Sequence, residues 1–233
     1  MKRNNFIILF QDAQYIAIHK PPGIHVHPTY LSRGEESCMK ILRDQIGQWV
    51  YPVHRLDRAA SGILLFGLSS EAAGKMIELF AERKVKKRYL AVARGYLPEE
   101  EIIDYPLREE PHKEAAEAIT QYRRLATVEL PFPLGKFPTT RYSLTEVFPH
   151  SGRKNQIRKH FTHISHPIIG DVRYGDGKHN RLFREKFAIH RLLLLAVSLS
   201  LIHPYSGEPL TLRADLPEEV KVLFQKLNWE NFG

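Results

Sequence analysis

A charged segment that runs directly into an apolar one constrains this chain most. Residues 54–62 read His-Arg-Leu-Asp-Arg-Ala-Ala-Ser-Gly, and residues 63–66 read Ile-Leu-Leu-Phe. A short apolar run bounded by turn residues is typical of a buried strand. The sequence therefore predicts a loop at the mouth of a buried strand, in which one carboxylate, Asp57, stands between two arginines, Arg55 and Arg58.

The chain is long enough to build one complete hydrophobic core. It has 233 residues, of which 43% are hydrophobic and 26% are charged, and this composition is far from that of disordered proteins. No shift in composition marks a linker. We therefore expect a single domain that spans residues 1–233.

Positive charge is in excess and is clustered. There are 34 lysines and arginines against 26 acidic residues, which gives a net charge of +8. The excess gathers at Arg83-Lys84 with Lys86-Lys87-Arg88, at Arg123-Arg124, and at Arg153-Lys154 with Arg158-Lys159. Such clusters favour a polyanionic partner, although each of them could equally be a solvated surface.

The single cysteine and the short apolar runs indicate the cellular compartment of the protein. Cys38 is the only cysteine, which excludes an internal disulfide and a cysteine-based metal site. The apolar run at residues 6–10 is too short for a signal peptide, and the run at residues 192–197 is too short for a membrane span. We expect a cytoplasmic protein that does not associate with membranes.

Short β-prone runs alternate with amphipathic stretches. We expect strands at residues 6–10 and 15–18, 63–66, 88–93, 122–130, 141–148, 193–202 and 210–212, with hairpins formed by the first two and the last two. We expect helices at residues 35–46, 69–80 and 153–164, and a helix-like acidic segment at residues 111–118. In the second helix the spacing of Ala73, Met76, Ile77 and Phe80 predicts the buried face.

Histidines recur in two places without predicting a metal site. His25 and His27 could offer two imidazoles to an ion, but a loop histidine before a proline is more often a surface residue. His160, His163 and His166 recur every third residue, yet Pro167 ends the helix before the third of them. We therefore expect no bound metal.

The chemistry open to Asp57 is limited by what surrounds it in the sequence. No serine, cysteine or second carboxylate is placed for a hydrolytic triad or a glycosidase pair. A lone carboxylate with basic neighbours can act as a nucleophile or as a base. It can also serve only as the centre of an ion network that ties a loop to the core.

Five ordered motifs resemble one enzyme family. His54-Arg55-Leu56-Asp57 with Ser61-Gly62 is similar to the active-site signature of the RluA-type pseudouridine synthases. The other motifs are Lys20-Pro21 with Gly23 and His27-Pro28, Lys87-Arg88-Tyr89, Gly152-Arg153 with Gln156-Ile157-Arg158, and residues 166–171 with Tyr174-Gly175. The resemblance extends from about Phe6 to Leu216, and Asn155 departs from it because the family usually has histidine there.

The resemblance implies a fold and a reaction. The fold would be α+β, with a mainly antiparallel, bent sheet and flanking helices, in one catalytic domain without a separate N-terminal RNA-binding module. The reaction would isomerise a uridine in RNA to pseudouridine, without metal or cofactor, by a monomeric enzyme. The subgroup that the chain resembles most acts on tRNA, at uridine-65 in the acceptor and T-stem region. Large-subunit rRNA as the substrate, and a non-catalytic RNA-binding protein, are the alternatives.

The resemblance also implies roles for individual residues. Asp57 would be the catalytic carboxylate, Arg158 its ion-pair partner, and Tyr89 the ring that lies against the uracil and assists proton removal. Arg55 would fill the gap that the flipped-out nucleotide leaves. The residues expected to bind RNA are Arg55, Arg58, Lys84, Lys86, Lys87, Arg88, Arg153 and Lys154.

Overall fold

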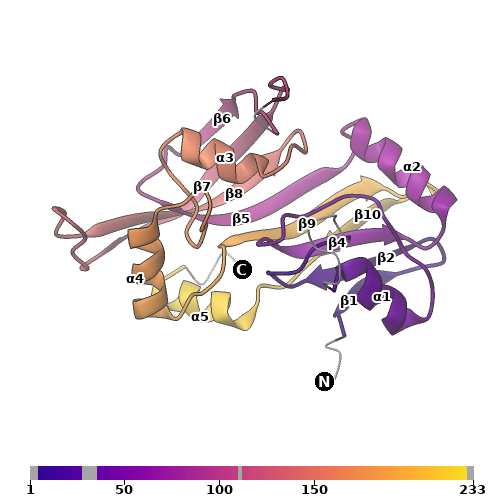
Figure 1. The fold of residues 1–233 in the computed structure, drawn as a ribbon, viewed down its shortest axis with the longest axis horizontal. Helices are drawn as coiled ribbons and strands as arrows, with labels where there is room; N and C mark the ends of the chain where they lie inside the picture. Colours follow the sequence, from indigo (N-terminus) through magenta and orange to yellow (C-terminus); the bar gives the residue numbers. More distant parts are fainter. Residues whose placement is uncertain (1–4, 28–35, 110–111, 230–233) are drawn as a thin grey trace. The chain divides into compact units, whose positions relative to one another are not determined.

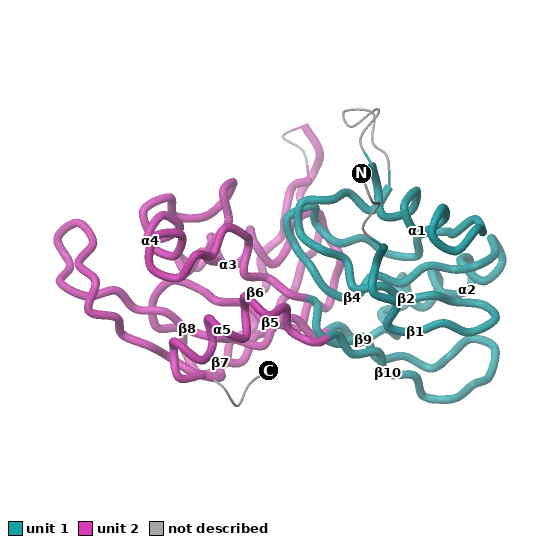
Figure 2. The backbone as a smooth tube through the Cα atoms, turned by 90° about the horizontal axis from the view of Figure 1, so that it is seen from below, with its two compact units in different colours: residues 1–87, 196–214 teal, residues 88–195, 215–233 magenta. Residues whose placement is uncertain are grey.

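The computed structural model describes residues 5–27, 36–109 and 112–229 and divides into two compact units. Unit 1 comprises residues 1–87 and 196–214, and unit 2 comprises residues 88–195 and 215–233 (Figure 2). The chain enters unit 2 within one strand and leaves it within another, β5 (Lys86–Arg94) and β9 (Leu194–Ile202).

The sheet of unit 1 is antiparallel wherever its pairing is described (Figure 1). Its strands are β1 (Ile8–Gln11), β2 (Tyr15–Lys20), β3 (Tyr51–Pro52), β4 (Ser61–Gly67), β9 and β10 (Pro209–Arg213). They run in the order β1-β2-β4-β9, while β10 pairs with β9 and β3 pairs with β4. Both predicted hairpins are confirmed as β1–β2 and β9–β10.

Two helices belong to unit 1. In α1 (Cys38–Ile46), the Ser37 side chain caps the N-terminus and Gly47 ends the helix with a left-handed backbone, φ +70°. The predicted start at Glu35 lies outside the described residues. In α2 (Ser70–Ala81) the predicted buried face is only partly right, because Ile77 is exposed whereas Ala73 and Met76 lie in the core.

The core of unit 1 forms where β4 meets its neighbours. Every residue of β4 is buried, which confirms the strand predicted from the apolar run at residues 63–66. The core cluster consists of Tyr15, Ala17, Val53, Ile63, Leu65, Ala72, Ala73, Met76, Val85, Leu199, Leu201 and Leu212. Burial of these side chains stabilises the frame from which the loop before β4 extends.

In unit 2, neighbouring strands pair antiparallel in the order β5-β8-β7-β6. The strands after β5 are β6 (Glu100–Asp104), β7 (Ile119–Leu130) and β8 (Thr140–Pro149). The helices of unit 2 are α3 (Gln156–His163), α4 (Gly177–Phe187) and α5 (Glu218–Lys226). The predicted α+β class with a mainly antiparallel sheet is confirmed, and in the described part of the chain no helix is long and apolar enough to cross a membrane.

One helix prediction in unit 2 is wrong, and a second helix begins three residues later than predicted. Residues 112–118 form no helix, and Pro111, where that prediction began, lies outside the described residues. The backbone there extends the antiparallel pairing of β6 with β7, because Leu107 and Ala116 exchange N–H to carbonyl hydrogen bonds of 2.9 and 3.0 Å. The second helix is α3, which begins at Gln156 and not at residue 153, since Asn155 has a left-handed backbone with φ +56°.

Candidate active site

The carboxylate singled out from the sequence lies on a short loop of unit 1. This Asp57 loop, residues 57–60, leads into β4 and is closed by a 3.1 Å hydrogen bond from the Ala60 N–H to the Asp57 carbonyl. The Leu56 side chain is buried, Asp57 is half-buried, and Arg55 is exposed. The buried Leu56 therefore anchors the chain just before the Asp57 loop, while Asp57 itself stays partly accessible to solvent.

A buried lysine holds the Asp57 loop. Lys20 is 0% exposed, and its ammonium donates to the carbonyls of Pro21, Arg58 and Ala60 at 3.0, 3.1 and 2.7 Å. Gly23 adds two contacts, since its N–H donates to the Arg58 carbonyl and its carbonyl accepts from Arg58 Nε. Sequence pattern identifies Lys20 only as part of a motif and not as a support of the loop, because its acceptors lie up to 40 residues away.

His54, the first residue of the signature, has a structural environment. Its Nε2 accepts a 3.0 Å hydrogen bond from the Leu65 N–H, and its ring stacks on Phe80 with centroids 4.8 Å apart. Burial, aided by the positive charge of Lys87, lowers the pKa of His54 to about 3. The imidazole is therefore neutral at pH 7, with its proton on Nδ1.

Lys87 is itself perturbed. Burial lowers the pKa of its ammonium to about 8, with a further contribution from the nearby charge of Arg83. A lysine with this pKa is close to its titration range at physiological pH. Of the predicted RNA-binding cluster, it is the member least like an ordinary surface cation.

Gly62 allows two strands of unit 1 to approach closely. Its backbone has φ +114°, and a Cβ atom there would lie 2.1 Å from the carbonyl oxygen of Ala196 on β9. Only glycine avoids both the strained backbone and the collision. The glycine of the signature is thus explained by the packing of the strand that follows the Asp57 loop.

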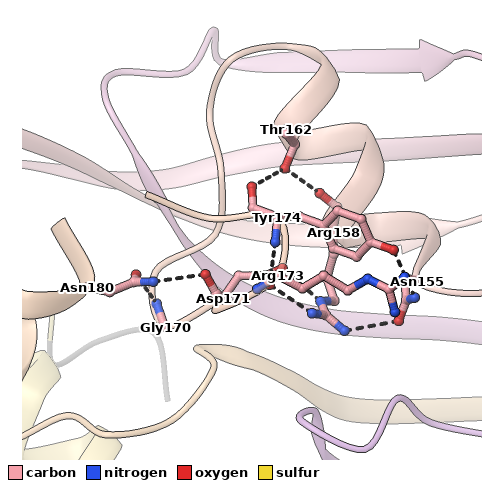
Figure 3. Close-up of polar contacts among 8 residues, drawn as sticks. All are labelled: Asn155, Arg158, Thr162, Gly170, Asp171, Arg173, Tyr174 and Asn180. Carbon is pink, nitrogen blue, oxygen red and sulfur yellow. Dashed lines mark hydrogen bonds and ion pairs between the residues drawn. The ribbon is translucent and has the colours of Figure 1, made fainter. Parts of the chain in front are cut away.

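Arg158, the predicted catalytic arginine of unit 2, is buried in an ion pair that the sequence did not reveal. Its Nε and Nη2 donate to the two carboxylate oxygens of Asp171, each at 2.7 Å, and its Nη1 donates to the Asn155 side chain at 3.0 Å (Figure 3). The guanidinium carbon also lies 5.1 Å from the centroid of the Tyr174 ring. The arginine is therefore held in one plane by a bidentate pair.

Asp171 is the centre of this network. Its Oδ1 also accepts the backbone N–H groups of Arg173 and Tyr174 at 2.9 and 3.0 Å, which forms a tight turn. Burial alone would raise the pKa of the Asp171 carboxyl, but the hydrogen bonds from Arg158 and from the two backbone groups hold it below its ordinary value. The pair is charged at neutral pH. Because Asp57 and Arg158 belong to different units, their pairing stays a prediction.

Asn155, which departs from the family pattern, has a defined role in this network. Its Oδ1 accepts from Arg158, and its Nδ2 donates to the Tyr174 hydroxyl at 3.2 Å. The amide therefore bridges the arginine and the aromatic ring that lies beside it (Figure 3).

Tyr89 is the fourth residue of β5 and is half-buried opposite Val147 of β8. Its neighbour Arg88 shares the buried carboxylate of Glu146 with Arg123, at 2.5 and 2.6 Å. The hydrogen bonds from both arginines outweigh the effect of burial, which raises the pKa of Glu146, and leave it below its ordinary value.

The other predicted RNA-binding residues are mostly exposed. Lys84 pairs with Glu82 at 2.7 Å, whereas Lys86 is exposed on β5. Arg153 and Lys154 are exposed in the turn before α3 and not on the helix itself. Their binding of RNA stays a prediction.

Comparison with known proteins identifies the family. A family model described as RNA pseudouridylate synthase matches residues 14–163, which include Asp57, Tyr89 and Arg158. The chain belongs to the RNA pseudouridylate synthase family.

Relatives of this pseudouridylate synthase cover nearly its whole length. It is 47% identical to tRNA pseudouridine synthase C of Vibrio parahaemolyticus serotype O3:K6, over 96% of this chain and 95% of that protein. It is also 47% identical to tRNA pseudouridine synthase C of Haemophilus influenzae, over 96% and 98%. The chain covers 95% of a solved structure, human RNA pseudouridylate synthase domain containing 4, and 93% of that chain, with a TM-score of 0.73 at 24% identity, which supports the fold.

The family explains why a loop of unit 1 and a helix of unit 2 each have a buried polar support. A synthase that rearranges one nucleotide needs a few side chains held in place, with their supports buried. Lys20 supports the Asp57 loop in unit 1, and Asp171 supports Arg158 in unit 2. In the part of the chain that the structure describes, no group of three or more His, Cys, Asp or Glu side chains is arranged to hold a metal ion.

Proposed function

We propose that the protein isomerises a uridine of tRNA to pseudouridine, at uridine-65 in the acceptor and T-stem region. The observation that carries the proposal is the match to relatives named tRNA pseudouridine synthase C over 96% of the chain. The position within tRNA rests on resemblance to that subgroup. The excess of positive charge, +8, is consistent with an RNA substrate.

The proposed reaction rearranges bonds within one nucleotide. The bond between C1′ and N1 breaks, the uracil turns, and a bond between C1′ and C5 forms. The proton on C5 is lost and N1 gains one, so nothing is added overall. Asp57 acts at the sugar, either by attack on it or by removal of its proton.

Each of the other two catalytic residues has a separate task in this proposal. Arg158 pairs with Asp57 and keeps it ionised and oriented, while its own orientation comes from Asp171. Tyr89 lies against the uracil and assists removal of the C5 proton. Exposed Arg55 fills the gap left in the RNA when the target nucleotide is flipped out, a step that costs about a few kcal/mol.

Release of tritium from tRNA that carries 5-tritiated uridine tests the proposal. We expect wild type to release tritium, Asp57→Asn to release none while it still binds tRNA, and Arg55→Ala to lose both activity and part of its affinity. Equal, negligible release by wild type and Asp57→Asn on tRNA and on rRNA would contradict an enzymatic role. Release from rRNA alone would contradict the tRNA assignment.

A further inference from the structure

Helix α4 carries a concentration of positive charge outside the clusters that were expected to bind RNA. Its eleven residues, Gly177–Phe187, include four cations against one carboxylate, Glu185. The cations are Lys178, Arg181, Arg184 and Lys186, and all four are exposed.

The opposite side of α4 is packed firmly in unit 2. Leu182 and Phe183 are buried, and the Phe183 ring lies edge-on to Tyr142 with centroids 4.8 Å apart. Asn180 is buried as well, and its side chain accepts from the Gly170 N–H and donates to the Asp171 carbonyl at 2.7 and 2.8 Å (Figure 3). The helix therefore turns a fixed basic face to solvent.

Most buried or half-buried arginines of unit 2 are neutralised. Arg158 pairs with Asp171, and half-buried Arg88 pairs with Glu146, whose carboxylate also binds the exposed Arg123. Two more arginines, Arg94 and Arg191, pair with Asp176 and Glu219 at 2.7 and 2.9 Å.

The cations of α4 differ from these arginines. Among the residues that the structure describes, the side chains of Lys178, Arg181 and Arg184 form no ion pair or hydrogen bond. The nearby carboxylate of Asp176 is already used by the Lys178 backbone N–H and by Arg94. Their charge is therefore available to an external anion.

We propose that this face of α4, formed by Lys178, Arg181 and Arg184, binds the sugar–phosphate backbone of the tRNA away from the nucleotide that reacts. The three side chains follow one another at i, i+3 spacing, which places their Cβ atoms about 5–6 Å apart along one stripe. Such a row offers successive charges to a phosphate chain, which contributes affinity and position but no sequence information. The inference rests on the proposed function.

The hydrogen bonds of Asn180 give this surface a link to the site. Through Asn180 the helix is bonded to the Asp171 turn, and through Asp171 to Arg158, all within unit 2. RNA bound on α4 would therefore be held in a fixed register to Arg158.

The double variant Arg181→Gln/Arg184→Gln tests the inference in the full chain. Its control, Lys40→Gln/Arg213→Gln, also removes two exposed positive charges, but from unit 1. Each lost phosphate contact should lower the slope of log affinity against log salt by about 0.7–0.9. We expect the slope of log affinity against log salt to be smaller by about 1.5 in the α4 variant than in wild type. We expect KM for tRNA to rise about tenfold and kcat to change by less than about twofold.

Two outcomes distinguish failure of this inference from failure of the proposed function on which it rests. If the slope and KM of the α4 variant equal those of the control, the cations only complement the dipole of the helix C-terminus, and the inference is wrong. If wild type releases no tritium from any RNA, the proposed function fails, while the salt dependence of tRNA binding still decides the role of α4.

Discussion

Replacement of Asp171 by asparagine tests whether the Arg158 network is a rigid support. The asparagine is nearly isosteric, but it cannot accept two Arg158 hydrogen bonds, and its amide nitrogen would face a guanidinium donor. The Arg158 side chain is 8% exposed and that of Asp171 is 1% exposed, so the arginine would keep a buried, uncompensated charge. Breaking such a pair costs about 3–5 kcal/mol of unfolding free energy.

The pH dependence of this loss has a definite sign. The pKa of Asp171 in the folded chain lies below its ordinary value. A carboxyl of this kind stabilises the fold above its unfolded pKa, about 4, and the stabilisation disappears as pH falls through the folded pKa. The difference between wild type and Asp171→Asn should therefore be full at pH 7 and should shrink below about pH 4.

Urea unfolding of both proteins across this pH range measures the difference. Asp215→Asn is the matched control, because Asp215 is an exposed carboxylate of unit 2, and we expect it to change stability by less than about 0.5 kcal/mol. A loss of under about 1 kcal/mol at pH 7 in Asp171→Asn would refute the argument that the pair holds Arg158.

Four further substitutions probe unit 1. Gly62→Ala should cost more than about 3 kcal/mol in thermal unfolding, because its Cβ would meet the β9 backbone, whereas Gly74→Ala in α2 should stabilise by about 0.5–1 kcal/mol because its site is open. Lys20→Met should lower kcat for tritium release, since three carbonyls around the Asp57 loop lose the hydrogen bond from the Lys20 ammonium; unchanged kcat would contradict this. His54→Asn should remove part of the loss of stability that wild type shows in urea as pH falls from 6.5 toward 3, because in that interval only unfolded His54 binds a proton.

Local sequence pattern predicts the helices and strands whose buried residues lie close together in the sequence. β4 is an uninterrupted apolar run before a glycine, and the β9–β10 hairpin has a proline- and glycine-containing turn between two apolar runs. In contrast, α4 has only Leu182, Phe183 and Phe187 as apolar residues, which is too few for a recognisable stripe. It is held by its asparagine and by aromatic contacts that no local pattern encodes.

The residues of the candidate active site also divide into those that local sequence pattern predicts and those that it does not. Asp57, Tyr89 and Arg158 could be named because each lies in a motif, but their supports could not. Lys20 reaches a carbonyl 40 residues away, and Arg158 is paired across 13 residues with an aspartate that the sequence identified only as part of a motif. Such pairs depend on the tertiary fold and not on local spacing.

The most direct test of the central claim is a map of pseudouridines in total RNA from cells that lack this protein, complemented with wild type or with Asp57→Asn. We predict that one tRNA site, uridine-65, is unmodified without the protein, is restored by wild type, and stays unmodified with Asp57→Asn. Restoration by Asp57→Asn, or a loss confined to rRNA, would contradict the account.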